Sequence, residues 1–135
     1  MSALPKHERL YEQRLISRLF SEGKHLSPSP RLRVRFLWIE RCGDEVEVSA
    51  PLPPVKLMVS ASKRNFKHAV TRNRVKRLLR EVYRFHKEEI SELVPLQKTL
   101  LLFLQYAGKE EVSLEEMKAL VQQFIGVFQK RLHRE

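Results

Sequence analysis

The chain has 135 residues and a mass of 16.0 kDa, which suffices for one domain and is too little for a catalytic domain plus a separate binding domain. Hydrophobic residues make up 42% and charged residues 31%, so we expect a compact soluble fold and exclude a disordered or fibrous chain. The net charge of +10 predicts a polyanionic partner or an anionic surface without deciding between them. A single domain over residues 1–135 is therefore expected.

Apolar residues at helical spacing, with Gly23 placed to end the helix, predict a first helix over residues 8–22. The Ser/Pro-rich segment 26–31 separates this helix from a predicted strand over residues 31–40. In that strand the side chains alternate between two faces, one with Val34, Phe36 and Trp38, the other with Arg33, Arg35 and Leu37. Residues 41–44 are predicted as a hairpin connection to a short strand around Val46 and Val48, and a third strand is predicted over residues 56–62.

The second half of the chain predicts a helix from about residue 69 to 89, an apolar interior strand over residues 98–106 and a last helix over residues 114–133. Ser113 and Glu116 match a capping box at the start of that last helix. The resulting order, αβββαβα, predicts an α+β two-layer sandwich in which helices cover a small sheet.

Two further features concern the compartment in which the protein works. The single cysteine, Cys42, cannot form an intramolecular disulfide, which suits a reducing compartment. Residues 1–15 lack the apolar segment of a secretion signal, and the longest apolar run, residues 100–104, is far too short to cross a bilayer. We therefore expect a cytoplasmic protein that does not insert into a membrane.

The positive charge is concentrated in one stretch of the chain. Residues 63–87 contain ten Lys or Arg and one acid, Glu81, whereas the other 110 residues contain sixteen bases and fifteen acids. On a helical wheel, one arc of the predicted second helix is apolar and is expected in the core: Val75, Leu78, Leu79, Val82, Tyr83 and Phe85. A separate arc is basic: Asn73, Lys76, Arg77, Arg80 and Arg84.

A rigid row of guanidinium groups favours phosphate recognition, because each group fits phosphate oxygens in a two-pronged geometry. Two alternatives remain open for this helix. The first is a solvated helix face, although such faces usually mix both signs of charge and this one is almost purely basic. The second is a helix on a membrane surface, which would present to lipid the large apolar residues that are expected in the core here. The function is therefore expected to lie in the basic stretch, with phosphate recognition favoured.

Residues 59–84, VSASKRNFKHAVTRNRVKRLLREVYR, resemble the signature of the bacterial ribonuclease P protein subunit family. The matching parts are Ser60 to Arg64, Ala69-Val70, Arg72-Asn73-Arg74 and the basic helix from Val75 to Arg84. The segment RLYEQRLISRLFSEG also resembles the opening of that family. The chain departs from the family pattern at Ile16, where a Phe is frequent, and has one extra residue between Lys63-Arg64 and Ala69-Val70, in the loop over residues 65–68.

The resemblance implies a ribosomal S5 domain 2-like fold and a subunit that binds the catalytic RNA of ribonuclease P and the 5′ leader of precursor tRNA, which the holoenzyme removes endonucleolytically. The residues implied in RNA-subunit binding are Arg72, Asn73, Arg74, Lys76, Arg77, Arg80 and Arg84. Those expected at a leader cleft between the first helix and the sheet are Ile16, Phe20, Phe36, Trp38, Ser60, Ser62, Lys63 and Arg64. For Phe20, Phe36 and Trp38, packing inside the domain remains an alternative to stacking on RNA bases.

The sequence shows no arrangement typical of a protein nuclease, such as clustered carboxylates for divalent metals or a positioned acid and base. Asp44, Glu45 and Glu47 are explained by a solvated acidic hairpin, and the histidines lack ligand spacing. We therefore expect no catalytic residue, metal or cofactor on the protein itself, and the resemblance implies Mg²⁺ bound with the RNA subunit. The protein alone is expected to be monomeric. A general RNA-binding protein of ribosomal type and a nuclease with an unrecognised site are the rival interpretations.

Overall fold

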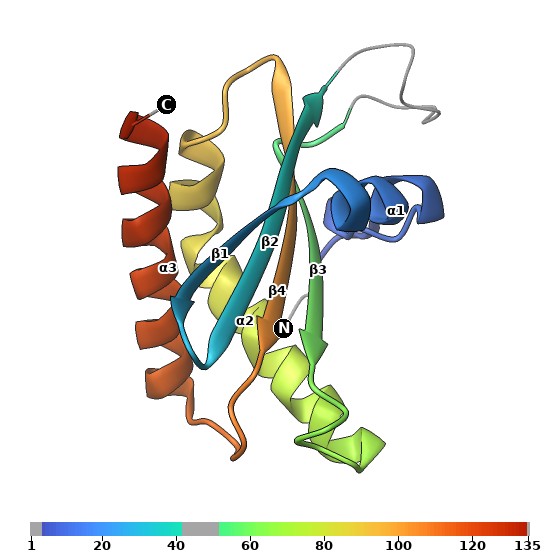
Figure 1. Cartoon of the computed structure of the whole chain (residues 1–135), viewed down its shortest axis with the longest axis vertical. Coiled ribbons are helices and arrows are strands. Elements are labelled where there is room, and N and C mark those ends of the chain that lie inside the picture. Colours follow the sequence, from blue (N-terminus) through green and yellow to red (C-terminus); the bar gives the residue numbers. More distant parts are fainter. Residues whose placement is uncertain (1–3, 42–51, 135) are drawn as a thin grey trace.

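The computed structural model describes residues 4–41 and 52–134. Its elements form one four-stranded sheet with helices on both faces (Figure 1). In chain order they are the 3-10 helix η1 (Lys6–Glu8), α1 (Gln13–Glu22), β1 (Lys24–Ser29), β2 (Leu32–Glu40), β3 (Val55–Ala61), α2 (Ala69–Glu92), β4 (Lys98–Tyr106) and α3 (Leu114–Arg134). The predicted α+β order αβββαβα is confirmed.

The strands lie in the order β1-β2-β4-β3. β2 runs antiparallel to both β1 and β4, while β3 runs parallel to β4 and connects to it through α2. β4 is an interior strand, and its residues Leu100, Leu101 and Leu102 are fully buried. Burial on both faces explains why this strand is an almost continuous apolar run and does not alternate.

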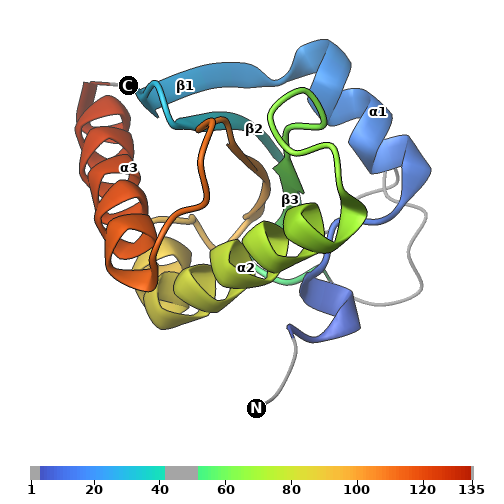
Figure 2. The ribbon, with the colours of Figure 1, turned by 90° about the horizontal axis from the view of Figure 1, so that it is seen from below.

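The helices divide the sheet into two unequal faces. Figure 2 shows α2 and α3 on one side of the curved sheet and α1 on the other. The larger core cluster lies under α2 and α3 and includes Phe36, Leu102 and Phe128. The smaller cluster lies under α1 and includes Leu19 and Leu101. Because α1 has only ten residues, the larger part of the packing energy comes from the α2 and α3 side.

The structure contains an edge strand that the sequence analysis did not predict. β1 occupies Lys24–Ser29, within the segment interpreted as a Ser/Pro-rich connection. Pro28 is tolerated because β1 is an edge strand, and the pairing with β2 is irregular between Leu26 and Ser29. The strand predicted around Val46 and Val48, and most of the hairpin leading to it, lie outside the described residues.

The N-terminal helix is shorter than predicted, because α1 begins at Gln13 and not near residue 8. The backbone N–H of Leu10 donates to the carbonyl of Leu57 at 2.8 Å, so the preceding segment runs alongside β3 and covers its outer edge. The ammonium group of the buried Lys56 on β3 lies 2.5 Å from the carboxylate of Glu12. These contacts fix the start of α1 on the sheet.

The prediction of which α2 residues face the core is confirmed at most positions and wrong at one. Val75, Leu79, Val82 and Tyr83 are buried. Phe85, which was also expected in the core, is 67% exposed. The ammonium group of Lys118 on α3 lies 4.8 Å from its ring centroid, so the ring packs at the rim of the α2–α3 interface and not inside it.

Candidate nucleic-acid interface

The first two-thirds of α2 carries a basic ridge, defined here as Arg72, Asn73, Arg74, Lys76, Arg77, Arg80 and Arg84. Asn73, Arg74 and Arg77 are exposed and the other four are half-buried. The buried side of the same helix, which includes Leu79 and Val82 at 0% exposure, holds the backbone under the ridge in place. The ridge is therefore a preorganised cationic surface.

Arg72 is engaged with the protein's own backbone. One of its terminal nitrogens, Nη1, donates to the carbonyls of Phe66 at 2.8 Å and Lys67 at 2.9 Å. These bonds tie the β3–α2 loop to the first turn of α2. Among the ridge residues, Arg72 therefore has a positioning role in addition to its charge.

Arg74 and Arg80 sit in different electrostatic surroundings. Arg74 forms an ion pair with Glu111 at 3.0 Å, but both side chains are well exposed, at 66% and 48%. Such an exposed pair contributes little to stability, so an anionic ligand can replace the carboxylate. Partial burial, with a smaller contribution from the charge of nearby Arg9, lowers the pKa of Arg80. The guanidinium remains charged at neutral pH, and an anion between it and Arg9 would relieve the repulsion.

The N-terminus of α2 adds to this positive field. His68 precedes the helix in an extended conformation without a side-chain cap, and the first turn contains no acidic residue. The unpaired N–H groups and the positive end of the helix dipole favour a negative partner there. The helix start and the ridge therefore attract the same kind of ligand.

The β3–α2 loop presents Lys63 and Arg64 to solvent, while Ser62 is half-buried at the end of β3. Asn65 donates to the carbonyls of Ala107 at 3.0 Å and Gly108 at 3.1 Å. Phe66 is buried, and its ring stacks on Tyr106 with centroids 6.1 Å apart. Asn65 and Phe66 thus anchor the loop that carries Lys63 and Arg64.

A second surface lies on the α1 side of the sheet, at the C-terminal end of α1. The ring of Phe20, 42% exposed, meets Phe103 of β4 edge-on at 5.2 Å. The guanidinium carbon of Arg35 lies 4.9 Å from the Phe20 ring centroid, and Arg35 donates to the Phe20 carbonyl at 2.6 Å and to His25 Nε2 at 2.8 Å. An exposed aromatic ring is thus fixed beside a cation.

By strand alternation and register, Arg33 of β2 and Ser60 of β3 share that side of the sheet. We call Phe20, Arg33, Arg35, Ser60 and Phe103 the α1-side surface. The structure places Phe20 and Ser60, both expected at a leader cleft, on this side of the sheet, and their binding to RNA stays a prediction. Ile16 is half-buried against the smaller core cluster, so it contributes to the base of the surface more than to its exposed part.

Two of the residues expected at the leader cleft are on the wrong face. Phe36 is 1% exposed and packs edge-on against Phe128 of α3 at 5.2 Å. Trp38 is half-buried on the same face and stacks on Phe128 at 6.1 Å. Both side chains point toward α3, because residues two apart in a strand share one face. The expectation that Phe36 and Trp38 line a cleft next to α1 is therefore wrong.

Sequence reasoning missed Phe103, Arg33 and Arg35 as parts of the α1-side surface. The sequence contained a signal for the two arginines: they alternate along β2 with apolar residues of the core, which places them on the opposite face. Phe103 could not be separated from its apolar neighbours, because β4 is buried along most of both faces and carries no alternation.

Within residues 4–41 and 52–134, no group of three or more His, Cys, Asp or Glu side chains is placed to hold a metal ion. The acidic residues Asp44, Glu45 and Glu47 lie outside these ranges. None of the helices in the described part of the chain is long and apolar enough to span a membrane.

Comparisons with known proteins agree with this architecture. The family model described as Ribonuclease P matches residues 4–130. A ribonuclease P protein component from Chlorobium phaeobacteroides is 37% identical over 93 residues, covering 69% of this chain and 60% of the relative. One from Porphyromonas gingivalis is 41% identical over 91 residues, covering 67% and 60%. The match thus spans 60% of the length of each of these two relatives. A ribonuclease P protein component from Chlorobaculum tepidum is 30% identical over 131 residues, covering 92% of this chain and 81% of the relative.

Solved structures share the fold at lower sequence identity. The ribonuclease P protein of Staphylococcus aureus superposes with a TM-score of 0.60 at 18% identity, over 89% of this chain and 94% of that one. The protein from Thermotoga maritima gives a TM-score of 0.61 at 21% identity, over 87% and 94%. A family model that matches nearly the whole chain, together with relatives above 30% identity, establishes that the chain belongs to the ribonuclease P protein family.

Proposed function

We propose that the chain is the protein subunit of ribonuclease P. It binds the catalytic RNA subunit through the basic ridge, and it binds the 5′ leader of precursor tRNA through the α1-side surface together with Ser62, Lys63 and Arg64 of the β3–α2 loop. The observation that carries the proposal is the presence of a rigid cationic helix face next to a separate surface of aromatic rings and guanidinium groups. The two surfaces suit two RNA ligands of different kinds.

The ridge suits a folded RNA. Its cations sit on one helix with a buried underside, so the backbone that carries them is already ordered when they contact phosphates. Each phosphate contact releases condensed counterions, which makes binding favourable and dependent on salt. Such contacts position the protein without reading sequence, as a subunit that docks on one RNA requires.

The α1-side surface suits a single strand. Unpaired bases stack on aromatic side chains and on guanidinium planes, and Phe20 with Arg35 offers both. Precursor tRNA has a single-stranded 5′ extension and the mature product does not. A protein that binds this extension raises the affinity of the holoenzyme for substrate over product.

Bond cleavage in this proposal belongs to the RNA subunit with its Mg²⁺. The described residues of the protein provide no metal-ligating cluster, and their part is to bind RNA, screen phosphate repulsion and position the leader. The protein acts in the cytoplasm and is a monomer before it assembles with RNA.

Reconstitution tests the proposal. The folded protein, added to its cognate catalytic RNA at physiological salt, is expected to stimulate cleavage of precursor tRNA at the 5′ end of the mature sequence. Protein alone with Mg²⁺ is expected to leave the substrate intact. Failure of the folded protein to stimulate the RNA, or cleavage by protein alone, would overturn the proposal and favour a general RNA-binding protein or a protein nuclease respectively.

A further inference from the structure

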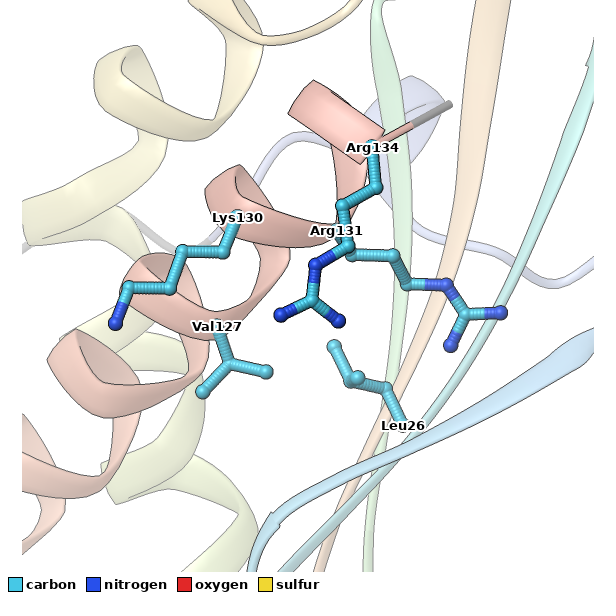
Figure 3. Close-up of a pocket in the computed structure, with 5 residues that line it drawn as sticks. All are labelled: Leu26, Val127, Lys130, Arg131 and Arg134. Atoms are coloured by element: carbon cyan, nitrogen blue, oxygen red, sulfur yellow. The ribbon is translucent and has the colours of Figure 1, made fainter.

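A pocket of about 410 Å³ lies between β1 and the last two turns of α3, on the α3 side of the sheet. It is lined by Leu26, Val127, Lys130, Arg131 and Arg134 (Figure 3). Leu26 and Val127 form an apolar floor, and the cations surround it. The side chains of Arg131 and Arg134 extend from α3 toward β1, while Lys130 extends on the other side of Val127. A pocket of this size falls within the range of small-ligand sites, which is about 300–1,000 Å³.

Contacts with the sheet hold one of the pocket's cations, Arg131, in place. Arg131 donates to the carbonyl of His25 on β1 at 3.2 Å, and its guanidinium carbon lies 5.2 Å from the ring centroid of Phe36. Arg134 and Lys130 are exposed. Among the described residues that line the pocket, none is acidic.

Stabilisation of the helix end explains only part of this arrangement. Cations in the last turn of a helix interact favourably with its dipole, and Arg131 and Arg134 lie in the last turn of α3. That interaction needs neither a hollow nor an apolar floor. A cationic rim around aliphatic side chains is instead suited to a nucleotide, whose base covers apolar surface while its phosphate meets the cations.

The pocket is continuous with the α1-side surface around the free edge of the sheet. β1 is the outermost strand, and His25 connects the two sides. Its ring nitrogen Nε2 contacts Arg35 on the α1 side, and its carbonyl accepts from Arg131 on the α3 side. Cations therefore follow one another around a single strand.

This geometry selects the kind of RNA that can occupy both sites. The two sites face opposite sides of one sheet, with only the width of β1 between them. A double helix is too stiff to turn around a single strand, whereas an unpaired strand is flexible enough to do so. The occupant that fits is a single-stranded RNA that already lies on the α1-side surface.

We propose that the upstream part of the 5′ leader passes around the edge of β1 and binds in the pocket formed by Leu26, Val127, Lys130, Arg131 and Arg134. This inference rests on the proposed function and deepens it, because it extends the leader site beyond the α1-side surface. It assigns the C-terminal end of α3 a role in binding substrates with long leaders.

The test uses the holoenzyme reconstituted with its cognate RNA and precursor tRNAs with leaders of about 4 and about 16 nucleotides, the range of single-strand site sizes. The pocket variant is Lys130→Gln with Arg134→Gln, which leaves the contacts of Arg131 intact. The matched control is Lys109→Gln with Lys118→Gln, which removes the same charge from the opposite end of α3 and the loop before it. Far-UV circular dichroism and thermal unfolding establish that both proteins are folded.

We expect the parent holoenzyme to bind the long-leader substrate several-fold more tightly than the short-leader substrate, and the pocket variant to lose this gain. The slope of log affinity against log salt should fall by about 0.7 per lost contact, for the long leader only. The control should behave as the parent does.

Several results would overturn the inference. Equal weakening for both leaders, or weaker assembly with the catalytic RNA, would place that RNA in the pocket. If the pocket variant keeps the affinity gain of the long leader, the cations only stabilise the end of α3. If the parent holoenzyme binds both leaders equally well, no upstream leader occupies the pocket. In each case stimulation of short-leader cleavage by the parent protein would still support the proposed function, so the two failures are distinguishable.

Discussion

Two phenylalanines on opposite faces of the sheet allow the placement of the leader surface to be tested directly. Phe36→Ala removes a ring that is 1% exposed and packs against Phe128, and truncating such a buried ring costs about 3–5 kcal/mol. Against a total stability of about 5–15 kcal/mol, we expect the melting temperature to fall by about 10 °C or more. Phe20→Ala removes the contacts with Phe103 and Arg35, worth about 1 kcal/mol each, so it should unfold only a few degrees lower.

In RNA binding the order of the two variants should be reversed, with the larger effect from Phe20→Ala. Loss of one stacked base costs about 1–3 kcal/mol, so Phe20→Ala should lower the affinity of the holoenzyme for precursor tRNA roughly tenfold relative to mature tRNA. Phe36→Ala, measured well below its melting temperature and with a leader of about 4 nucleotides that does not reach the α3-side pocket, should leave that ratio unchanged. Thermal unfolding followed by circular dichroism and equilibrium binding of the two tRNAs make both measurements. The reasoning is refuted if Phe36→Ala changes the affinity ratio while Phe20→Ala does not.

Three further predictions concern other parts of the molecule. Arg72→Ala should lose about 1.5–3 kcal/mol of stability and expose the β3–α2 loop to trypsin, because two hydrogen bonds from a charged donor are removed; Arg77→Ala is the control and should do neither. The fluorescence of Trp38, the only tryptophan, should report unfolding but stay constant when a leader oligonucleotide of about 4 nucleotides binds to the α1-side surface. A change in its emission with this short oligonucleotide would contradict its place on the α3 side. Burial alone would raise the pKa of Glu12, but hydrogen bonds, chiefly to Lys56, lower it. Since the folded state then binds its proton less readily than the unfolded state, this stabilisation is present above the ordinary glutamate pKa and is lost as pH falls below about 4. In denaturant unfolding, Glu12→Gln should therefore be less stable than the parent at neutral pH, and its free energy of unfolding should decrease less as the pH is lowered. Parallel pH profiles of the two proteins would count against the ion pair.

Local signals in the sequence predicted much of the fold because the structure obeys them. The capping box at the last helix forms as expected, with the backbone N–H of Glu116 donating to Ser113 Oγ at 3.2 Å. The long apolar run predicted as an interior strand is β4, with the predicted bounds. The basic arc of α2 is separated from its buried side, so angular position on a single helix was sufficient to locate the ridge.

Features that depend on tertiary context were not predictable in the same way. β1 lacks alternation and contains Pro28, and it is a strand only because β2 offers it an edge. The alternation of β2 separates Phe36 and Trp38 from the arginines, but it does not say which face lies under α3. The pairing of Phe20 with Phe103 joins residues far apart in the chain, so no local pattern could reveal it.

The salt dependence of binding between the protein and its cognate catalytic RNA shows whether the ridge on α2 contacts RNA phosphates. Arg77 is an exposed member of the ridge, and replacing it by Gln removes one charge without disturbing the buried side of α2. We predict weaker binding and a slope of log affinity against log salt that is smaller by about one, with no change for Lys118→Gln on α3. An Arg77→Gln protein with the parent's affinity and the parent's slope would contradict the assignment of the ridge to RNA.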